Sequence, residues 1–266
     1  MLVLATDHRD AYEARYDGDA AAISAAKALV VDGALAAAER RPKARAQGAL
    51  AVLVDEQYAA ATVEPLRAAG LGVAMPVERG GGDEFEFAFG EQFDRHLTEL
   101  PPDVAKALVR WSPGDPPARK ARQAERLLRL QETLDALAVP LMFELIVPEA
   151  AGAEADRAQL TIAAMADVCA HGIRADVWKL EPQAGADAYA QVREAAEGVP
   201  CIVLGAGGEL PAVAAHVRTA MAEGWAGFAV GRSIWGPALD AYAAGADRAS
   251  CVEQVADAYT LLIDAA

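Results

Sequence analysis

Short apolar runs rich in β-branched residues alternate with longer Ala- and Leu-rich segments of helical period, and this alternation repeats eight times along the chain. Several runs are apolar at every position, as in Cys201–Leu204, which is typical of parallel strands covered on both faces. Eight β-then-α units in 266 residues are what a (β/α)8 barrel requires. The pattern therefore predicts an α/β protein, a single-domain barrel over residues 1–266.

Strands are expected in the eight short runs, at Leu2–Arg9, Ala49–Asp55, Gly72–Val77, Ala105–Ser112, Pro140–Pro148, Ala175–Pro182, Pro200–Gly207 and Gly227–Trp235. Helices are expected at roughly 20–40, 60–69, 92–99, 117–138, 154–171, 186–197, 210–223 and 236–264. A doubly wound open sheet is the alternative, but no GxGxxG motif follows the first run.

One stretch interrupts the rhythm after the third strand, and we expect an insertion at about 79–100. Three glycines open it, and Phe85, Phe87 and Phe89 then alternate with Glu84 and Glu86. This period of two predicts a short strand or hairpin outside the barrel. The segment is either a lid or oligomer contact, or an ordinary packed insertion.

The net charge of −15 argues against nucleic-acid partners and anionic membrane surfaces, both of which attract basic proteins. The longest run without a charged residue is 11 residues, Gly198–Gly208, and a membrane helix needs about 18. The first residues lack the basic and apolar regions of a signal peptide. Three widely spaced cysteines form neither a CxxC pair nor a disulfide framework. We expect a cytoplasmic protein.

Charged side chains interrupt three of the apolar strands. Lys106 and Arg110 lie on the fourth, Glu144 on the fifth, and Lys179 and Glu181 on the sixth. Successive strand residues alternate between faces, so the two charged residues of the fourth strand share a face, as do those of the sixth. Alternate strands fill common layers in a barrel, which predicts that Lys106 and Lys179 are near neighbours.

A lysine inside a strand is unusual because an unpaired buried charge is costly. Burial and a neighbouring cation both favour the neutral amine, which can attack a ketone and form a Schiff base. Glu144 on the adjacent strand is placed to shuttle protons. The alternative is a structural ion pair of Lys179 with Glu144 or Glu181.

The last two strands end in glycines. Gly205, Gly207 and Gly208 precede a helix that can start at Leu210, and Gly231-Arg232 follows one unit later. Exposed backbone N–H groups, a helix start and a guanidinium together favour an anion. Barrels frequently bind phosphate after strands seven and eight, so we expect a phosphate site here rather than only tight turns.

No two of the four histidines have the HxH or HxxxH spacing of metal ligands, which argues against a zinc site. The first strand ends in Asp7-His8-Arg9, and His8, beside Asp7, is a candidate substrate contact. Trp178 has the opposite strand parity to Lys179 and should face the helices.

Several strand-end motifs, in order, resemble the class I aldolases of the tagatose-bisphosphate and sulfofructose-phosphate group. The resemblance is closer to the 2-deoxy-5-keto-gluconate-6-phosphate aldolase-like domain of inositol catabolism and covers about residues 2–262. The motifs are Asp7-His8-Arg9, Met75-Pro76-Val77-Glu78, Phe85–Gly90, Leu108–Pro113, Asp176–Glu181 and Gly227–Trp235.

The resemblance implies a metal-free aldolase without a cofactor. It assigns the Schiff base to Lys179, the acid/base role to Glu144, assistance at the ketone oxygen or hydroxyls to Lys106, and a carboxylate role to Asp7. Substrate contacts are then expected from His8, Arg9, Arg110, Glu181, Gly205, Gly207, Gly208, Gly231 and Arg232. His8 stands where tagatose-type enzymes have Gln, and Gly205 where they favour Ser, which weakens a tagatose-bisphosphate assignment.

The function expected from the sequence is cleavage of a phosphorylated keto-sugar or keto-acid. The leading substrate is 2-deoxy-5-keto-gluconate 6-phosphate, giving dihydroxyacetone phosphate and malonate semialdehyde. One alternative is an aldolase or transaldolase for tagatose-bisphosphate or sulfofructose-phosphate. Another is a non-catalytic sugar-phosphate-binding barrel with a regulatory role. The partner is a small phosphorylated sugar, and a homo-oligomer is compatible with the sequence.

Overall fold

The structure is a computed structural model that describes residues 1–148 and 157–266. Over these two ranges, eight strands follow one another in the sheet in chain order, and the order closes into a barrel. Strands β1 and β8 pair in parallel, which closes the order and excludes an open doubly wound sheet. The predicted (β/α)8 fold is confirmed.

The strands are β1 Leu2–Ala5, β2 Leu50–Leu53, β3 Gly72–Pro76, β4 Val104–Arg110, β5 Leu141–Ile146, β6 Val177–Leu180, β7 Cys201–Leu204 and β8 Phe228–Val230. The helices are α1 Arg9–Arg15, α2 Ala20–Arg40, α3 Pro42–Ala46, α4 Glu56–Ala59, α5 Val63–Ala68, α6 Phe93–Glu99, α7 Pro117–Leu137, α8 Arg157–Ala170, α9 Ala186–Ala195, α10 Leu210–Ala222, α11 Arg232–Ala243 and α12 Arg248–Ala265, with short 3-10 turns at Ala60–Thr62 and Gly90–Gln92. Residues 154–156 of the helix predicted at 154–171 lie outside the described residues.

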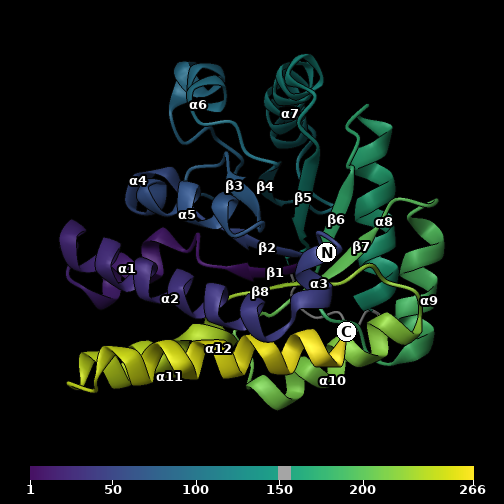
Figure 1. The fold of residues 1–266 in the computed structure, drawn as a ribbon. Helices are drawn as coiled ribbons and strands as arrows, with labels where there is room; N and C mark the ends of the chain where they lie inside the picture. Colours follow the sequence, from purple (N-terminus) through teal and green to yellow (C-terminus); the bar gives the residue numbers. More distant parts are fainter. Residues whose placement is uncertain (149–156) are drawn as a thin grey trace. The chain divides into compact units, whose positions relative to one another are not determined.

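The chain groups into two compact units. The first comprises Met1–Met75, Leu204–Arg218 and Gly227–Ala266. In it β1 lies between β2 and β8, and α2 runs side by side with α12 (Figure 1). Gly33 permits the close approach of these helices, because a Cβ at this position would lie 2.5 Å from the Cβ of Val255.

The second unit comprises Pro76–Val203 and Thr219–Ala226, and within it β4, β5, β6 and β7 pair in sequence. One face of these strands is apolar and belongs to a core shared with α7, α8 and α9. Trp178 lies in this core with its ring 5.2 Å from that of Phe143, as its strand parity predicts. The opposite face carries the charged strand residues.

The insertion after β3 contains no strand, contrary to the hairpin prediction. A single antiparallel bridge joins Glu78 to Phe87, and the backbone N–H of Arg79 donates to the carbonyl of Glu86 at 2.7 Å. Phe85 and Phe87 are buried against α7. The alternation of period two therefore reflects inward and outward side chains of a packed segment, and it fits the interpretation as a packed insertion.

Among the described residues one helix, α2, is long and apolar enough to cross a membrane by length and composition alone. The search of the sequence for long runs without a charged residue did not find α2, because Lys27 and Asp32 lie within it. Its Ile23, Leu29 and Val30 are fully buried in the first unit. The apolar composition of α2 is thus used in core packing.

Candidate active site

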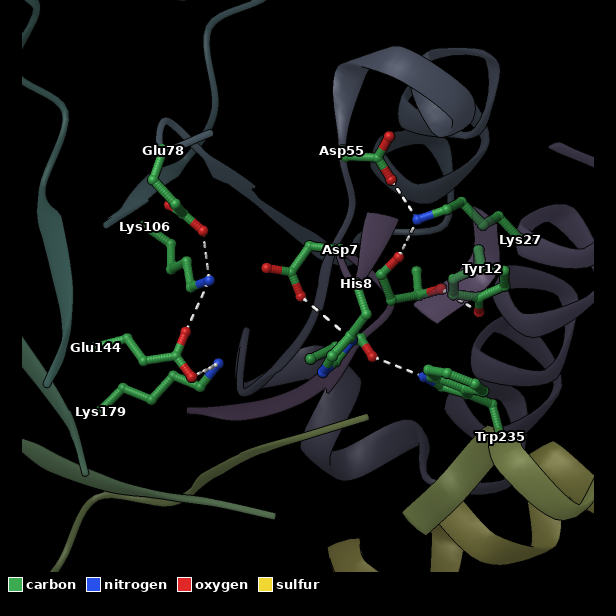
Figure 2. A network of polar contacts seen from close by, with 12 residues as sticks. Asp7, His8, Tyr12, Lys27, Asp55, Glu78, Lys106, Glu144, Lys179 and Trp235 are labelled. Carbon is green, nitrogen blue, oxygen red and sulfur yellow. Dashed lines mark hydrogen bonds and ion pairs between the residues drawn. The ribbon is translucent and has the colours of Figure 1, made fainter. Parts of the chain in front are cut away.

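Two lysines and two glutamates form a buried cluster in the second unit (Figure 2). The Nζ atom of Lys179 lies 2.9 Å from Oε1 of Glu144, and the Nζ atom of Lys106 lies 2.7 Å from Oε2 of the same carboxylate. Lys106 also donates to Glu78 at 2.7 Å. The four side chains thus form one chain, in which Glu144 is shared by both amines.

The strand register produces this cluster. Glu144 on β5 is the register partner of Lys179 on β6 and of Leu108 on β4. Lys106 lies two residues before Leu108 and therefore points to the same face. Lys106 and Lys179, predicted to be near neighbours, are joined through the strand between them.

The cluster balances its charges in a site that water hardly reaches. The two lysine side chains are 3–4% exposed and the two glutamate side chains 9%. Buried charges require partners at hydrogen-bond distance, and each amine here has a carboxylate. A carboxylate bonded to a buried amine is also placed to take a proton from it, which is what imine chemistry needs.

Glu78 is the member of this cluster that sequence reasoning did not assign to the site. It follows β3 directly, at the end where the barrel places its chemistry. The sequence therefore contained a signal for Glu78, namely a carboxylate close after the end of an apolar strand. The other strand-end residues were selected on the same ground.

Arg110 and Glu181, the two other charged residues that were predicted on strands, have their partners elsewhere in the second unit. Arg110 donates to the carbonyl of Gly82 in the insertion at 3.0 Å. Glu181 accepts from the backbone N–H of Val147 at 3.2 Å and pairs with Arg157 at 3.4 Å. The ion pair of Lys179 is therefore with Glu144, and the structure does not bring Arg110 or Glu181 into the cluster.

In the first unit, Asp7, His8 and Arg9 follow β1. Asp7 is buried, and its Oδ1 lies 3.7 Å from Nδ1 of His8. Arg9 begins α1, and its backbone N–H donates to the carbonyl of Asp7 at 2.8 Å. Gly231 permits the approach of β8 to this segment, because a Cβ there would lie 2.4 Å from both the Ala5 carbonyl oxygen and the His8 ring.

The glycine turn after β7 lies against Arg232. Gly207 has φ +75, and a Cβ on it would lie 3.1 Å from Cζ of Arg232. The Ser233 hydroxyl donates to the carbonyl of Gly208 at 2.5 Å, and the N–H of Gly208 donates to the carbonyl of Gly205 at 3.1 Å. These two hydrogen bonds hold the turn at residues 205–208 next to the guanidinium of Arg232.

The starts of two helices also belong to this region. Arg232 is the first residue of α11, and α10 begins at Leu210, as predicted. A pocket of about 490 Å³ is lined here by Gly207, Gly208, Arg232 and Ser233, among other residues. Because the first residues of α10 and α11 and the guanidinium of Arg232 line the same pocket, this end of it suits an anion.

In residues 1–148 and 157–266, no group of three or more His, Cys, Asp or Glu side chains is arranged to hold a metal ion.

Comparison of the sequence with curated proteins gave no match. A family model described as "Uncharacterized protein conserved in bacteria (DUF2090)" matches residues 1–266, the whole chain. The chain belongs to the DUF2090 family. Beyond this family, the comparisons give information about the fold of the chain.

Solved structures similar to this DUF2090 protein include several aldolases. An archaeal fructose 1,6-bisphosphate aldolase has a TM-score of 0.65 at 14% identity, with 98% of this chain and 93% of that chain covered. An archaeal fructose-1,6-bisphosphate aldolase with its catalytic Lys covalently bound to the carbinolamine intermediate has a TM-score of 0.64 at 14% identity, covering 98% and 92%. The fructose-bisphosphate aldolase from Slackia heliotrinireducens has a TM-score of 0.61 at 12% identity, covering 96% and 85%. At these identities the likeness concerns the fold.

Proposed function

We propose that this DUF2090 protein is a class I aldolase that cleaves a phosphorylated keto-sugar or keto-acid through an imine on Lys179. The observation that carries the proposal is the sharing of one buried carboxylate, Glu144, by two strand lysines. Imine chemistry needs a nucleophilic amine, a proton carrier and a second cation near the substrate oxygens, and Lys179, Glu144 and Lys106 can fill these three roles.

The reaction starts when the Lys179 ammonium gives a proton to Glu144. The free amine adds to the ketone carbon, and the ketone oxygen leaves as water with the proton that Glu144 returns. The carbon–carbon bond then breaks, and its electron pair moves toward the iminium nitrogen while Glu144 takes the proton of the substrate hydroxyl. The aldehyde product leaves, the enamine is protonated, and water hydrolyses the imine to regenerate Lys179.

The other side chains complete the proposal. Lys106, fixed between two carboxylates, assists at the substrate oxygens, and Glu78 holds it in place. Asp7 serves as a further carboxylate, and His8 and Arg9 contact substrate. The phosphate binds at Gly205, Gly207, Gly208, Gly231 and Arg232. No metal and no cofactor is required, so we expect activity to survive prolonged chelation.

The aldolase fold of the similar solved structures supports this reaction class, because one of them holds its catalytic Lys as a covalent carbinolamine. The sequence motifs favour 2-deoxy-5-keto-gluconate 6-phosphate as substrate, with dihydroxyacetone phosphate and malonate semialdehyde as products. Such a substrate implies a role in inositol catabolism and a cytoplasmic location.

The test is a cleavage assay that couples released dihydroxyacetone phosphate to its reduction. We expect turnover of 2-deoxy-5-keto-gluconate 6-phosphate, and a loss of at least about 10³-fold in Lys179→Met, since the covalent step has no substitute nucleophile. Faster cleavage of tagatose-bisphosphate or sulfofructose-phosphate would reassign the substrate. Phosphate-dependent binding of all three without cleavage would make the protein a regulatory binder.

A further inference from the structure

A third lysine is buried in the first unit, outside the proposed reaction. Lys27 lies on α2, and its side chain is fully inaccessible to solvent. Its Nζ atom makes an ion pair with Asp55, whose side chain is 1% exposed, and donates to the carbonyl of Thr6 at 2.5 Å. It also lies 4.3 Å from the centre of the Tyr12 ring (Figure 2).

These contacts converge on the two residues that precede Asp7. Besides the Lys27 bond to Thr6, the hydroxyls of Thr6 and Tyr12 lie 2.7 Å apart, and Nε1 of Trp235 donates to the carbonyl of Ala5 at 2.9 Å. Figure 2 shows Lys27, Tyr12 and Trp235 on the side of Asp7 that carries these bonds. The backbone that leads into Asp7 is therefore held from α1, α2 and α11 at once.

The charge of Lys27 also acts on this end of β1. Burial lowers the pKa of the Lys27 amine, and Asp55 and, more weakly, Asp7 raise it again. The charge of Lys27 therefore interacts with Asp7 as well as with Asp55.

Stability alone does not account for a lysine at this position. A buried ion pair is often no more stabilising than apolar side chains of similar volume. The other buried residues of α2 are apolar or glycine. What an apolar residue cannot do is bind the Thr6 carbonyl and carry a charge near Asp7.

We propose that the Lys27–Asp55 pair is a positioning pair, which fixes the end of β1 so that the Asp7 side chain is held in the orientation that the reaction uses. This inference rests on the proposed function, because it presumes that Asp7 takes part in the reaction. Lys27 itself does not touch substrate, since its side chain is fully buried.

The experiment compares Lys27→Met with Lys120→Met. Lys120 is a matched control, because it also pairs with an aspartate, Asp167, at 2.9 Å, and its amine donates in addition to the carbonyl of Pro113 rather than to a member of the catalytic cluster. For each variant we measure kcat per site that borohydride traps as a dihydroxyacetone phosphate adduct. A purely structural role lowers the number of trappable sites and leaves this ratio unchanged.

We expect Lys27→Met to lower kcat per trappable site by about 10- to 100-fold, the size of effect that a misplacement of about 1 Å produces. Lys120→Met should keep the wild-type ratio. If Lys27→Met does not fold, the double variant Lys27→Met with Asp55→Asn replaces it, because Asn removes the second charge and still accepts from the N–H of Tyr58.

The inference is overturned if the ratio equals the wild-type value, if Asp7→Asn keeps full turnover, or if neither Lys27 variant folds, which would make the pair a folding requirement. Its failure is distinct from that of the proposed function. The absence of any trapped adduct in the wild-type protein contradicts the aldolase proposal, whereas normal trapping with an unchanged ratio contradicts only the role of Lys27.

Discussion

At the scale of single residues, the position of Glu144 sets what the cluster can do. Each of its two carboxylate oxygens lies within 2.9 Å of a different lysine. Glu144 can therefore exchange a proton with either lysine without a change in backbone conformation or in solvent exposure. This arrangement also keeps both lysines in defined rotamers, which favours one of them as nucleophile and the other as a fixed cation.

We predict that Glu144→Gln lowers kcat by about 10²–10⁴, the usual contribution of general acid–base catalysis. The amide keeps the shape of the side chain but cannot accept a proton. Steady-state kinetics on the phosphorylated ketose measure the effect, with the exposed Glu99→Gln on α6 as control. A near-wild-type kcat in Glu144→Gln would remove this residue from the mechanism.

Strand alternation and barrel layering predicted that Lys106 and Lys179 are near neighbours, with Glu144 on the adjacent strand. The register of β4, β5 and β6 shows that these three side chains meet. The partners of Arg110 and Glu181 could not be predicted in this way. Their side chains lie at strand ends, where partners come from loops and helices, and sequence periodicity carries no information about such partners.

At the scale of elements, the strands begin close to where the sequence predicts them but end earlier. β8 stops at Val230, and Arg232 is already the first residue of α11, although Gly227–Trp235 was expected to be one strand. The predicted helix at 236–264 is two helices, because Gly245 has φ +93 and Asp247 caps α12 by accepting from the N–H of Ser250. Apolar composition alone did not reveal these boundaries.

The insertion is held by α7. Arg126 donates to the carbonyl of Phe85 at 2.9 Å, Arg122 pairs with Glu84 at 2.6 Å, and Arg129 pairs with Glu91 at 2.7 Å. These arginines recur on one side of the helix, at intervals of three to four residues. The helix thereby anchors the segment that begins with Glu78, a member of the catalytic cluster.

The start of α11 and the turn after β7 lead to a prediction about Arg232. We expect Arg232→Ala to raise KM for the phosphorylated ketose by about 10- to 150-fold, because a charge-assisted hydrogen bond contributes about 1.5–3 kcal/mol. Weak activity on an unphosphorylated analogue should change little. The comparison of the two substrates measures the effect.

Arg248→Ala is the control, since this arginine pairs with Asp32 on the same unit and away from the turn. Equal losses on the phosphorylated and unphosphorylated substrates would show that Arg232 is structural and that the phosphate site lies elsewhere.

At the scale of the whole molecule, the strand order is closed. Each of the two compact units contains about half of the strands. A half-barrel alone exposes strand edges with unpaired backbone groups, which is unfavourable. We therefore predict that the chain folds as one domain, as the sequence pattern suggests, and that it unfolds in a single transition.

Trp235→Phe makes this prediction measurable. In this variant the remaining tryptophans, Trp111, Trp178 and Trp225, all lie in the second unit, so tryptophan fluorescence reports the unfolding of that unit. Circular dichroism reports the unfolding of the entire chain. Urea titrations by the two methods should have the same midpoint and slope. Different midpoints would mean that the units unfold independently.

The central claim is that Lys179 forms a covalent imine, and reductive trapping tests it most directly. The wild-type protein is incubated with dihydroxyacetone phosphate and borohydride, digested, and mapped by mass spectrometry, with reactions lacking the ketone and with Lys179→Met as controls. We expect one adduct, on the peptide that contains Lys179, and none in Lys179→Met. An adduct on Lys106, or no adduct on any lysine, would contradict it.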